Sequence, residues 1–353
     1  MTAAGRPRVG LWGAGVMAGA HAASCQALGW KIAGVASRRL ATAETLATAV
    51  GAPAMSYDAL LASDGVDLVI VSTPPADHLP AARAWTARGI PTVVSTPLCQ
   101  TLDDADELVA LEARSGPPLL FASNLATAPA VQAMFARAAD LGRPTTLAGR
   151  SYRGAPTWGA FTTGGWGGGV LLHPAVHHLT LMLLLARVAD AGRPTAVAAR
   201  LVPNAHDVDE HADVELSFAS GLRARIAVGW TGADRIWDLQ LASTDAVLRL
   251  DMDPTPVLEH NGEPVAIAPA RSTPARFREL ADVGLIAQLR SFWHDIEHRR
   301  TPVMNMAFGR EVLDIVCAAS ASAKRSGQDV ALPFSGPRDR TPLALWREPG
   351  GSA

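Results

Sequence analysis

The chain has 353 residues, of which 48% are hydrophobic and 18% are charged, and it carries a formal net charge of −2 at pH 7. This length predicts about two domains of ~100–200 residues each, and the composition excludes an intrinsically disordered chain. The near-neutral charge lacks the basic excess that is typical of proteins binding nucleic acids or anionic membranes.

Signals for metal binding, disulfides and targeting are sparse. The three cysteines, Cys25, Cys99 and Cys317, lie far apart in no metal-binding spacing, which argues against a disulfide framework or a zinc site. No apolar signal core precedes the first apolar run. The most apolar stretch, residues 170–186, is shorter than the ~20 residues that cross a bilayer. We therefore expect a cytoplasmic protein with no metal, nucleic-acid or membrane partner.

Residues 1–125 alternate short apolar runs with helical patterns. Strands are expected over residues 8–11, 32–36, 68–71, 92–94 and 119–122, and helices over residues 17–28, 42–50, 79–88 and 101–115. Strands that alternate with helices are typical of a parallel, doubly wound sheet. The expected fold class of this part is therefore α/β.

Residues 126–335 follow a different pattern. Helices are expected over residues 129–141, 174–186, 286–298 and 307–325, and period-2 runs over residues 197–202, 214–218, 222–228, 239–242 and 247–251. Such runs, separated by turn signals, predict a mainly antiparallel sheet and thus an α+β domain. Residues 336–353, rich in Pro, Arg and Gly, are expected to form a loosely packed C-terminal tail.

A glycine-rich segment joins the first strand to the first helix. It reads Gly13-Ala14-Gly15-Val16-Met17-Ala18 and matches the G-x-G-x-x-G/A fingerprint. Gly13 permits a tight turn, Gly15 lets a pyrophosphate approach the backbone, and Ala18 allows the helix to pack closely on the sheet. The helix N-terminus attracts the anion. Residues 1–125 are therefore predicted to form a dinucleotide-binding Rossmann domain.

The end of the second strand bears on the choice of dinucleotide. A site that prefers NAD normally has Asp or Glu there, because a carboxylate accepts hydrogen bonds from the ribose hydroxyls. This chain has Ser37 and Arg38 instead, a hydroxyl and a guanidinium group that suit a 2′-phosphate. The alternative is that Arg38 and Arg39 form a solvated pair on a loop. We expect NADP as the preferred cofactor, ahead of NAD.

Three further segments follow the fingerprint in order along the chain. They are residues 69–78, which contain Thr73-Pro74, residues 89–97, which end in Ser95-Thr96-Pro97, and residues 167–177, which contain His173 and His177. Together these motifs resemble the Gfo/Idh/MocA oxidoreductase family over nearly the whole chain. The resemblance implies that a substrate and oligomerisation domain with a large open sheet, residues 126–335, follows the Rossmann domain. It also implies a homodimer or homotetramer.

The resemblance further implies hydride transfer between a nicotinamide and a carbonyl or hydroxyl carbon, usually of a sugar, a cyclitol or a related polyol. Together with the fingerprint and the second strand, it predicts one set of cofactor-binding residues. These are Gly13, Ala14, Gly15, Val16, Met17, Ser37, Arg38, Ser72, Thr73, Pro74, His78, Ser95, Thr96 and Asn124.

Several positions depart from the family pattern. The Glu-Lys-Pro motif of the family reads Ser95-Thr96-Pro97 here, so the lysine that contacts cofactor and substrate is replaced by Thr96. In the family's Asp-x-Gly-x-His-x-x-Asp segment, His173 and Thr180 replace the two aspartates, and only His177 is retained. A neutral hydroxyl lacks the charge that stabilises a developing alkoxide, and losing such a donor typically costs ~3–4 kcal/mol.

The retained histidine is the main catalytic candidate. Imidazole has a usual pKa near ~6.5, so His177 is suited to act as acid or base near neutral pH. His173 is expected to orient His177 or share its proton, and Thr96 to donate a hydrogen bond. The alternative for each histidine is a hydrogen-bonded core residue. The four-residue spacing of His173 and His177 also suits zinc, but Pro174 is expected to begin the helix after His173.

Aromatic side chains near these histidines are candidate substrate contacts. Trp158 and Trp166 flank the glycine-rich entry to the helix and, with Tyr152, His173 and His177, are the expected substrate residues. Ordinary packing is the alternative for the tryptophans.

Two functions follow from these residues. The first is an NAD(P)-dependent oxidoreductase with His177 as acid or base. The second is a repurposed family member with non-redox or transient-redox chemistry, or a nucleotide-binding regulatory role.

Overall fold

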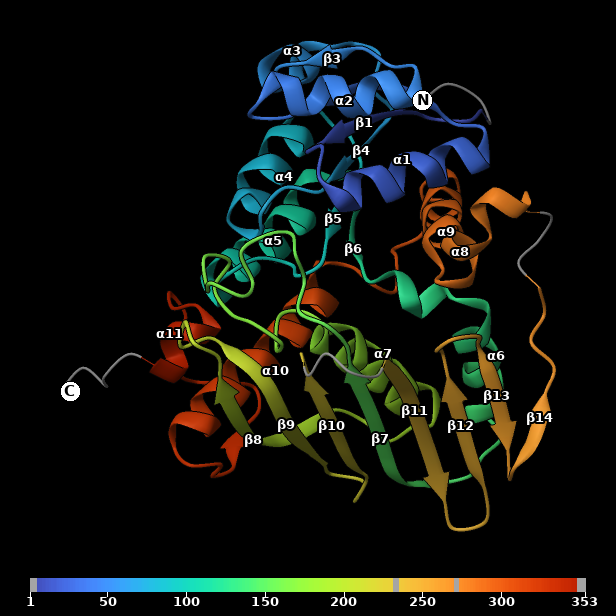
Figure 1. Cartoon of the computed structure of the whole chain (residues 1–353), viewed down its shortest axis with the longest axis vertical. Helices are drawn as coiled ribbons and strands as arrows, with labels where there is room; N and C mark the ends of the chain where they lie inside the picture. Colours follow the sequence, from blue (N-terminus) through green and yellow to red (C-terminus); the bar gives the residue numbers. More distant parts are fainter. Residues whose placement is uncertain (1–4, 231–234, 270–272, 348–353) are drawn as a thin grey trace. The chain divides into compact units, whose positions relative to one another are not determined.

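The computed structural model describes residues 5–230, 235–269 and 273–347 (Figure 1). The chain divides into two compact units, each described here by itself. The first comprises Met1–Cys99, Asp103–Ala128 and Ala270–Arg310, and the second comprises Gln100–Leu102, Pro129–Pro269 and Glu311–Ala353. Residues 270–310, predicted from the sequence to belong to the second domain, thus group with the first unit. No helix in the described ranges combines the length and the apolar character that a membrane span requires.

The first unit contains a six-stranded parallel sheet in the order β3-β2-β1-β4-β5-β6. Its strands are β1 (Arg8–Trp12), β2 (Lys31–Ala36), β3 (Ala54–Met55), β4 (Leu68–Val71), β5 (Thr92–Ser95) and β6 (Leu119–Ala122). Its helices are α1 (Val16–Leu28), α2 (Leu40–Val50), α3 (Tyr57–Ala62), α4 (His78–Ala87), α5 (Leu102–Ser115), α8 (Arg278–Asp282) and α9 (Leu285–Glu297), with 3-10 turns η1 (Pro75–Asp77), η2 (Asn124–Thr127) and η3 (Ala275–Phe277). The predicted doubly wound sheet is confirmed.

The strand order of this sheet reverses at one point. Successive strands proceed from β1 to β3 in one direction and from β4 to β6 in the other, so the order reverses between β1 and β4. In open parallel sheets, ligands bind beside the carboxyl ends of the strands at such a reversal. The residues that follow β1 and β4 therefore lie where a ligand site is expected.

The second unit contains a nine-stranded sheet in the order β14-β13-β12-β11-β7-β10-β9-β8-β15. Its strands are β7 (Pro144–Tyr152), β8 (Pro194–Pro203), β9 (Asp209–Phe218), β10 (Arg223–Gly229), β11 (Ile236–Ser243), β12 (Val247–Asp251), β13 (Val257–His260), β14 (Glu263–Val265) and β15 (Val330–Ala331). Its helices are α6 (Pro129–Ala138), α7 (Ala175–Val188), most of α10 (Met306–Lys324) and α11 (Pro342–Arg347). Strands β7 and β10 run parallel, and the other described pairings are antiparallel, which confirms the predicted sheet.

The two faces of this sheet differ in character. In β9, Ala212, Val214 and Leu216 are buried, whereas the alternating Asp213 and Glu215 are not. Side chains alternate across a strand, so one face carries apolar residues and the other carries charged ones. Helix α7 packs against the apolar face, where His178 lies over β7. We call the charged face the outer face.

Candidate functional site

The glycine-rich turn after β1 is shaped by a close backbone approach. Gly13 has a φ of +111°, and a Cβ atom there would lie 2.7 Å from the carbonyl oxygen of Ser72. The amide N–H of Gly13 donates to the Ala36 carbonyl at 2.8 Å. Only glycine fits this position, because both the positive φ and the absence of Cβ are required. The turn is thereby held against the carboxyl ends of β2 and β4.

The next residues present free backbone at the start of α1. Gly15 is the N-cap of this 13-residue helix. Apart from its chain neighbours and the helix backbone, no heavy atom of the described residues lies within 4 Å of the place its Cβ would occupy. Ala14 and Met17 are partly buried, and Val16 is exposed. The unpaired N–H groups of a helix N-terminus and its dipole favour an anion. The predicted fingerprint residues therefore fit the pyrophosphate of a dinucleotide.

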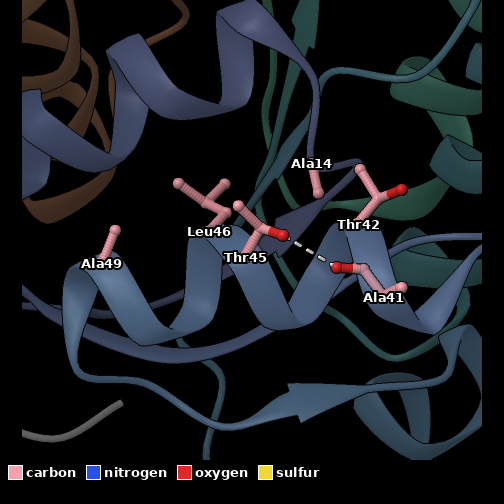
Figure 2. A pocket seen from close by; sticks show the side chains of 6 residues that line it. All are labelled: Ala14, Ala41, Thr42, Thr45, Leu46 and Ala49. Carbon is pink, nitrogen blue, oxygen red and sulfur yellow. Dashed lines mark hydrogen bonds between the residues drawn. The ribbon is translucent and has the colours of Figure 1, made fainter.

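A pocket of about 520 Å³ opens beside the glycine-rich turn. It is lined by Ala14 and by one side of α2, namely Ala41, Thr42, Thr45, Leu46 and Ala49 (Figure 2). The lining is mostly small and apolar, and the Thr45 hydroxyl donates to the Ala41 carbonyl at 3.0 Å. Such a surface offers shape and apolar contact to a ligand held at the turn.

Arg38, which the sequence analysis assigns to the 2′-phosphate of NADP, follows the end of β2. Ser37 is partly buried, and Arg38 and Arg39 are exposed. The Tyr57 ring stacks on Trp12 with centroids 4.2 Å apart. Burial raises the pKa of Tyr57, as does the charge of Asp77, while the charge and backbone of Arg38 lower it. Arg38 and Asp77 thus both act on this tyrosine, near the glycine-rich turn.

Serine hydroxyls link the ends of the next two strands. Ser72 Oγ, after β4, lies 3.2 Å from Ser95 Oγ, at the end of β5. Thr73, Pro74 and Thr96 are partly buried beside them. These predicted cofactor residues therefore lie together in the first unit, at the carboxyl ends of adjacent strands.

His78 is buried between two loops of the first unit. Its ring is buried, with Nδ1 at 2.9 Å from the Leu98 carbonyl and Nε2 at 2.9 Å from the Thr73 carbonyl. Burial lowers the pKa of His78, and the two carbonyl acceptors oppose this shift. A neutral imidazole has a single N–H, so only one of these two carbonyls accepts a hydrogen bond from it. His78 lies between the loops after β4 and β5, and its contact with a dinucleotide stays a prediction.

Asn124 lies in η2 and also makes internal contacts. Its amide nitrogen donates to the Val283 carbonyl at 2.6 Å, and Thr127 Oγ1 donates to the Gly284 carbonyl at 2.7 Å. Gly284 has a φ of +83°, and a Cβ there would lie 2.3 Å from the Asn124 carbonyl oxygen. The loop after β6 is therefore fixed against the start of α9, in the segment that groups with the first unit.

His173 lies within an aromatic cluster in the second unit. Its ring stacks on Phe161 with centroids 4.8 Å apart and meets the edge of Trp158 at 5.2 Å. Trp166 meets Phe161 at 4.7 Å and Trp158 at 6.2 Å. The structure therefore brings together the predicted residues Trp158, Trp166 and His173. It adds Phe161, which the sequence does not single out.

His177 lies in the first turn of α7, and His173 precedes the helix. The pKa of both histidines is lowered to about 3. Burial is the main cause, the charge of Arg153 contributes to both shifts, and His173 contributes to the shift of His177. At neutral pH both imidazoles are therefore uncharged. His178 is buried, its Nε2 lies 3.1 Å from the Asp238 carbonyl, and its ring packs on Trp237. It is a core residue.

Tyr152, a predicted substrate residue, faces away from this cluster. A Cβ at Gly149 would lie 2.6 Å from the His178 ring, so Gly149 faces α7. Tyr152 is three residues further along β7 and therefore lies on the outer face, where it stacks on His211 with centroids 5.9 Å apart. The structure does not bring Tyr152 and the histidines together.

Asp209 fixes the glycine-rich loop that leads to His173. Its carboxylate is 2% exposed and accepts hydrogen bonds from the N–H groups of Gly169 (2.7 Å) and Leu171 (2.8 Å). A Cβ at Gly169 would lie 2.0 Å from the Asp209 carbonyl oxygen. Burial raises the pKa of Asp209 to about 6, against these hydrogen bonds. The sequence does not reveal this role, because nothing in the polar run around Asp209 shows that its carboxylate is buried in the fold.

Helix α11 packs on the same loop. The Leu343 N–H donates to the Gly167 carbonyl at 2.9 Å, and Pro342 and Leu345 are buried. Arg347 Nε donates to the Asp207 carbonyl at 3.0 Å. The prediction of a loosely packed tail is therefore wrong for the described residues 336–347.

Within the described ranges, no group of three or more His, Cys, Asp or Glu side chains is arranged to hold a metal ion.

Comparison with known families decides where the chain belongs. A model of the oxidoreductase family with an NAD-binding Rossmann fold, GFO_IDH_MocA, matches residues 7–122, and the GFO/IDH/MocA C-terminal domain matches residues 132–248. The chain belongs to the Gfo/Idh/MocA family. It is thus a member of an NAD-binding oxidoreductase family, as the motifs predict. A search of curated proteins found no match.

Solved structures share the fold of this family member. GenD2 from gentamicin A biosynthesis, in complex with NAD, is 22% identical with a TM-score of 0.81, covering 94% of this chain and 98% of its own. UDP-N-acetylglucosamine 3-dehydrogenase GnnA from Acidithiobacillus ferrooxidans is 24% identical (TM-score 0.74; 88% and 95% covered). Aldose-aldose oxidoreductase from Caulobacter crescentus, complexed with glycerol, is 19% identical (TM-score 0.79; 93% and 100% covered).

Proposed function

We propose that this family member is an NADP-dependent oxidoreductase acting on a carbonyl or hydroxyl carbon of a sugar-like or cyclic compound. The observation that carries the proposal is His177, an uncharged imidazole at the start of α7, beside His173 and its aromatic cluster. The names of the structural neighbours support the substrate class, because they include a nucleotide-sugar dehydrogenase and an aldose-aldose oxidoreductase.

The first unit supplies the residues for the dinucleotide. Gly13 and Gly15 offer their backbone to the pyrophosphate, and Arg38 offers a guanidinium fork to a 2′-phosphate. A bound nicotinamide dinucleotide supplies the acceptor or donor of the hydride. The hydroxyls of Ser72 and Thr96, after β4 and β5, are available to orient that group.

The second unit supplies the proton transfer. In the direction of oxidation, an imidazole nitrogen of His177 accepts the proton of the substrate hydroxyl group. Burial, His173, Arg153 and His178 lower the pKa of His177 to about 3. The ring is therefore unprotonated at neutral pH and can accept the proton, but it is a weaker base than an imidazole of the usual pKa. His173 is held by Phe161 and Trp158 and orients the substrate or His177.

The test is the change His177→Ala, with His206→Ala as the matched control, because His206 is an exposed histidine of the same unit. Reduction of NADP⁺ is followed at 340 nm over a panel of aldoses, inositols and sugar acids, and NADPH affinity is measured by calorimetry. We expect His177→Ala to lower kcat by about 10²–10⁴-fold, with nucleotide affinity within about twofold. Equal losses in both, or no loss in either, remove His177 from the mechanism.

A second function is favoured by the changes at Ser95, Thr96, His173 and Thr180. A family member with this altered set suits a non-redox or transient-redox reaction, or a regulatory role that uses the bound nucleotide. The same panel separates the two functions. Tight NADPH binding without NADP⁺ reduction on any compound supports the second.

A further inference from the structure

Several buried polar atoms without hydrogen-bond partners lie on α7, just before it, or on β7, the strand that His178 of α7 covers. In the described part of the second unit they include Ser151 Oγ, His173 Nδ1, His178 Nδ1 and Thr180 Oγ1. Buried polar atoms in native interiors are nearly always hydrogen-bonded, so a group of orphaned atoms marks a place for polar ligand atoms. This place adjoins His177, the proposed acid or base.

Arg153 brings a positive charge to the same place. Leu147, Gly149 and Ser151 of β7 are buried and face α7, and Arg153 continues this alternation directly after the strand. Its backbone N–H donates to the Gly229 carbonyl at 3.2 Å, which fixes its position at the end of β10. Its charge lowers the pKa of His173 and His177, in accord with a guanidinium group on this side of the sheet.

Arg153 differs from neighbouring arginines, which make direct ion pairs with carboxylates. Arg150, on the outer face, donates to Asp238 through Nε at 2.9 Å and through a second nitrogen, and Arg235 pairs with Asp253 at 3.4 Å. In the described ranges, no ion pair joins Arg153 to a carboxylate. His173 and His177, whose pKa values Arg153 affects, are neutral and cannot balance its charge. The carboxylate of Asp253 raises the pKa of Arg153, but burial and the charge of Arg235, which pairs with Asp253, have larger effects and lower it. A partly buried cation without a direct ion pair is stabilised by a ligand that supplies a negative charge.

We propose that Arg153 binds an anionic group of the substrate, a carboxylate or a phosphate, so that the substrate class is an acidic or phosphorylated sugar-like compound. The proposal rests on the proposed function of the site. A guanidinium fork matches the oxygens of either group in a bidentate manner, which fixes the orientation of the ligand as well as its charge. The aromatic cluster of Trp158, Phe161 and Trp166 supplies apolar surface for a sugar ring nearby.

The test is calorimetric binding of D-glucuronate, D-glucose 6-phosphate and D-glucose to the full-length protein and to Arg153→Gln. We expect at least one of the two anions to bind more tightly than D-glucose. We also expect Arg153→Gln to weaken that binding by about tenfold or more, the loss typical of a charge-assisted hydrogen bond. The matched control is Arg225→Gln, because Arg225 lies on the outer face of β10 and pairs with Asp213 at 3.1 Å. It should change binding by less than about twofold.

The two anions distinguish the carboxylate source from the phosphate source, and the one whose binding depends on Arg153 identifies the group. Arg153→Lys keeps the charge and should retain part of the affinity, which separates loss of charge from loss of folding. If neither anion binds more tightly than D-glucose, or if Arg153→Gln leaves anion binding unchanged, the proposal is overturned. Hydride transfer is measured separately. Redox activity confined to neutral polyols rejects the anion site alone, and anion binding without redox activity rejects the oxidoreductase function alone.

Discussion

Thr96 stands where the motif resemblance predicts the lysine of the Glu-Lys-Pro motif. It lies directly after β5, next to Ser95, whose hydroxyl is 3.2 Å from Ser72 Oγ. We predict that Thr96→Lys raises NADP⁺ reduction on polyols by about 10²–10³-fold, because an ammonium group stabilises a developing alkoxide where a neutral hydroxyl does not. The rate is measured at 340 nm, with Thr146→Lys on exposed β7 surface as control.

No rise in rate for Thr96→Lys, in a protein that still binds NADPH, contradicts the idea that this position limits ordinary hydride transfer. The substrate would then be held in another geometry, or the site would have no redox role.

Residue-level prediction succeeds where the backbone itself carries the signal. The glycine-rich turn can be predicted from the sequence because Gly13 lies so close to the Ser72 carbonyl that only glycine fits there. The contacts of His78 cannot be predicted in the same way. Its residue type suits a ligand contact, but its two nitrogens face carbonyls of different loops, and these contacts exist only in the folded chain.

At the scale of elements, β7 shows why one central strand escapes sequence analysis. Its positions facing α7 are Leu147, Gly149 and Ser151, so the apolar alternation is interrupted. Gly149 leaves room for the His178 ring, and Ser151 is two residues from Arg153, the proposed anion-binding residue. A strand whose inward positions are set by such contacts lacks the apolar–polar alternation from which strands are predicted. Short elements such as β3 and α11 carry no period at all.

Asp209 gives the element-scale prediction. Asp209→Ala leaves the N–H groups of Gly169 and Leu171 without their acceptor inside the protein. We expect a loss of about 2–4 kcal/mol in the free energy of unfolding, because each unsatisfied buried donor costs about 1–3 kcal/mol. Urea unfolding followed by tryptophan fluorescence measures it.

The control for Asp209→Ala is Asp207→Asn, in the same loop but with an exposed side chain, for which the expected loss is under about 0.5 kcal/mol. Equal losses for the two variants would show that the carboxylate of Asp209 does not hold the glycine-rich loop.

For the whole molecule, the sequence predicts both sheets, because their hydrophobic periods persist over many residues. It does not predict that residues 270–310 group with the first unit, because that grouping depends on contacts such as Asn124 with Val283, 159 residues apart. The homodimer or homotetramer stays a prediction.

The pH dependence of stability follows from four histidines with lowered pKa values: His21 and His178, at about 4, and His173 and His177, at about 3. Between pH 6.5, their usual pKa, and about 4, the unfolded chain binds protons that the folded chain does not. Stability is therefore full above pH 6.5 and falls as the pH is lowered, by about 1.4 kcal/mol per pH unit for each histidine.

Asp209 acts in the opposite direction. Its folded pKa of about 6 exceeds the usual 3.8, so between these values the folded state holds the extra proton and offsets one histidine. We expect the melting temperature in differential scanning calorimetry to fall steadily from pH 7 to pH 5. A melting temperature that is constant over this range would show that these histidines are not held neutral by burial.

The central claim, a dinucleotide site that prefers NADP, is tested most directly by calorimetric titration with NADPH and, separately, with NADH. We predict that NADPH binds about tenfold or more tightly than NADH, and that Arg38→Ala removes the difference while Arg39→Ala leaves it. Binding of neither nucleotide by folded protein, or equal binding of both, would contradict the account.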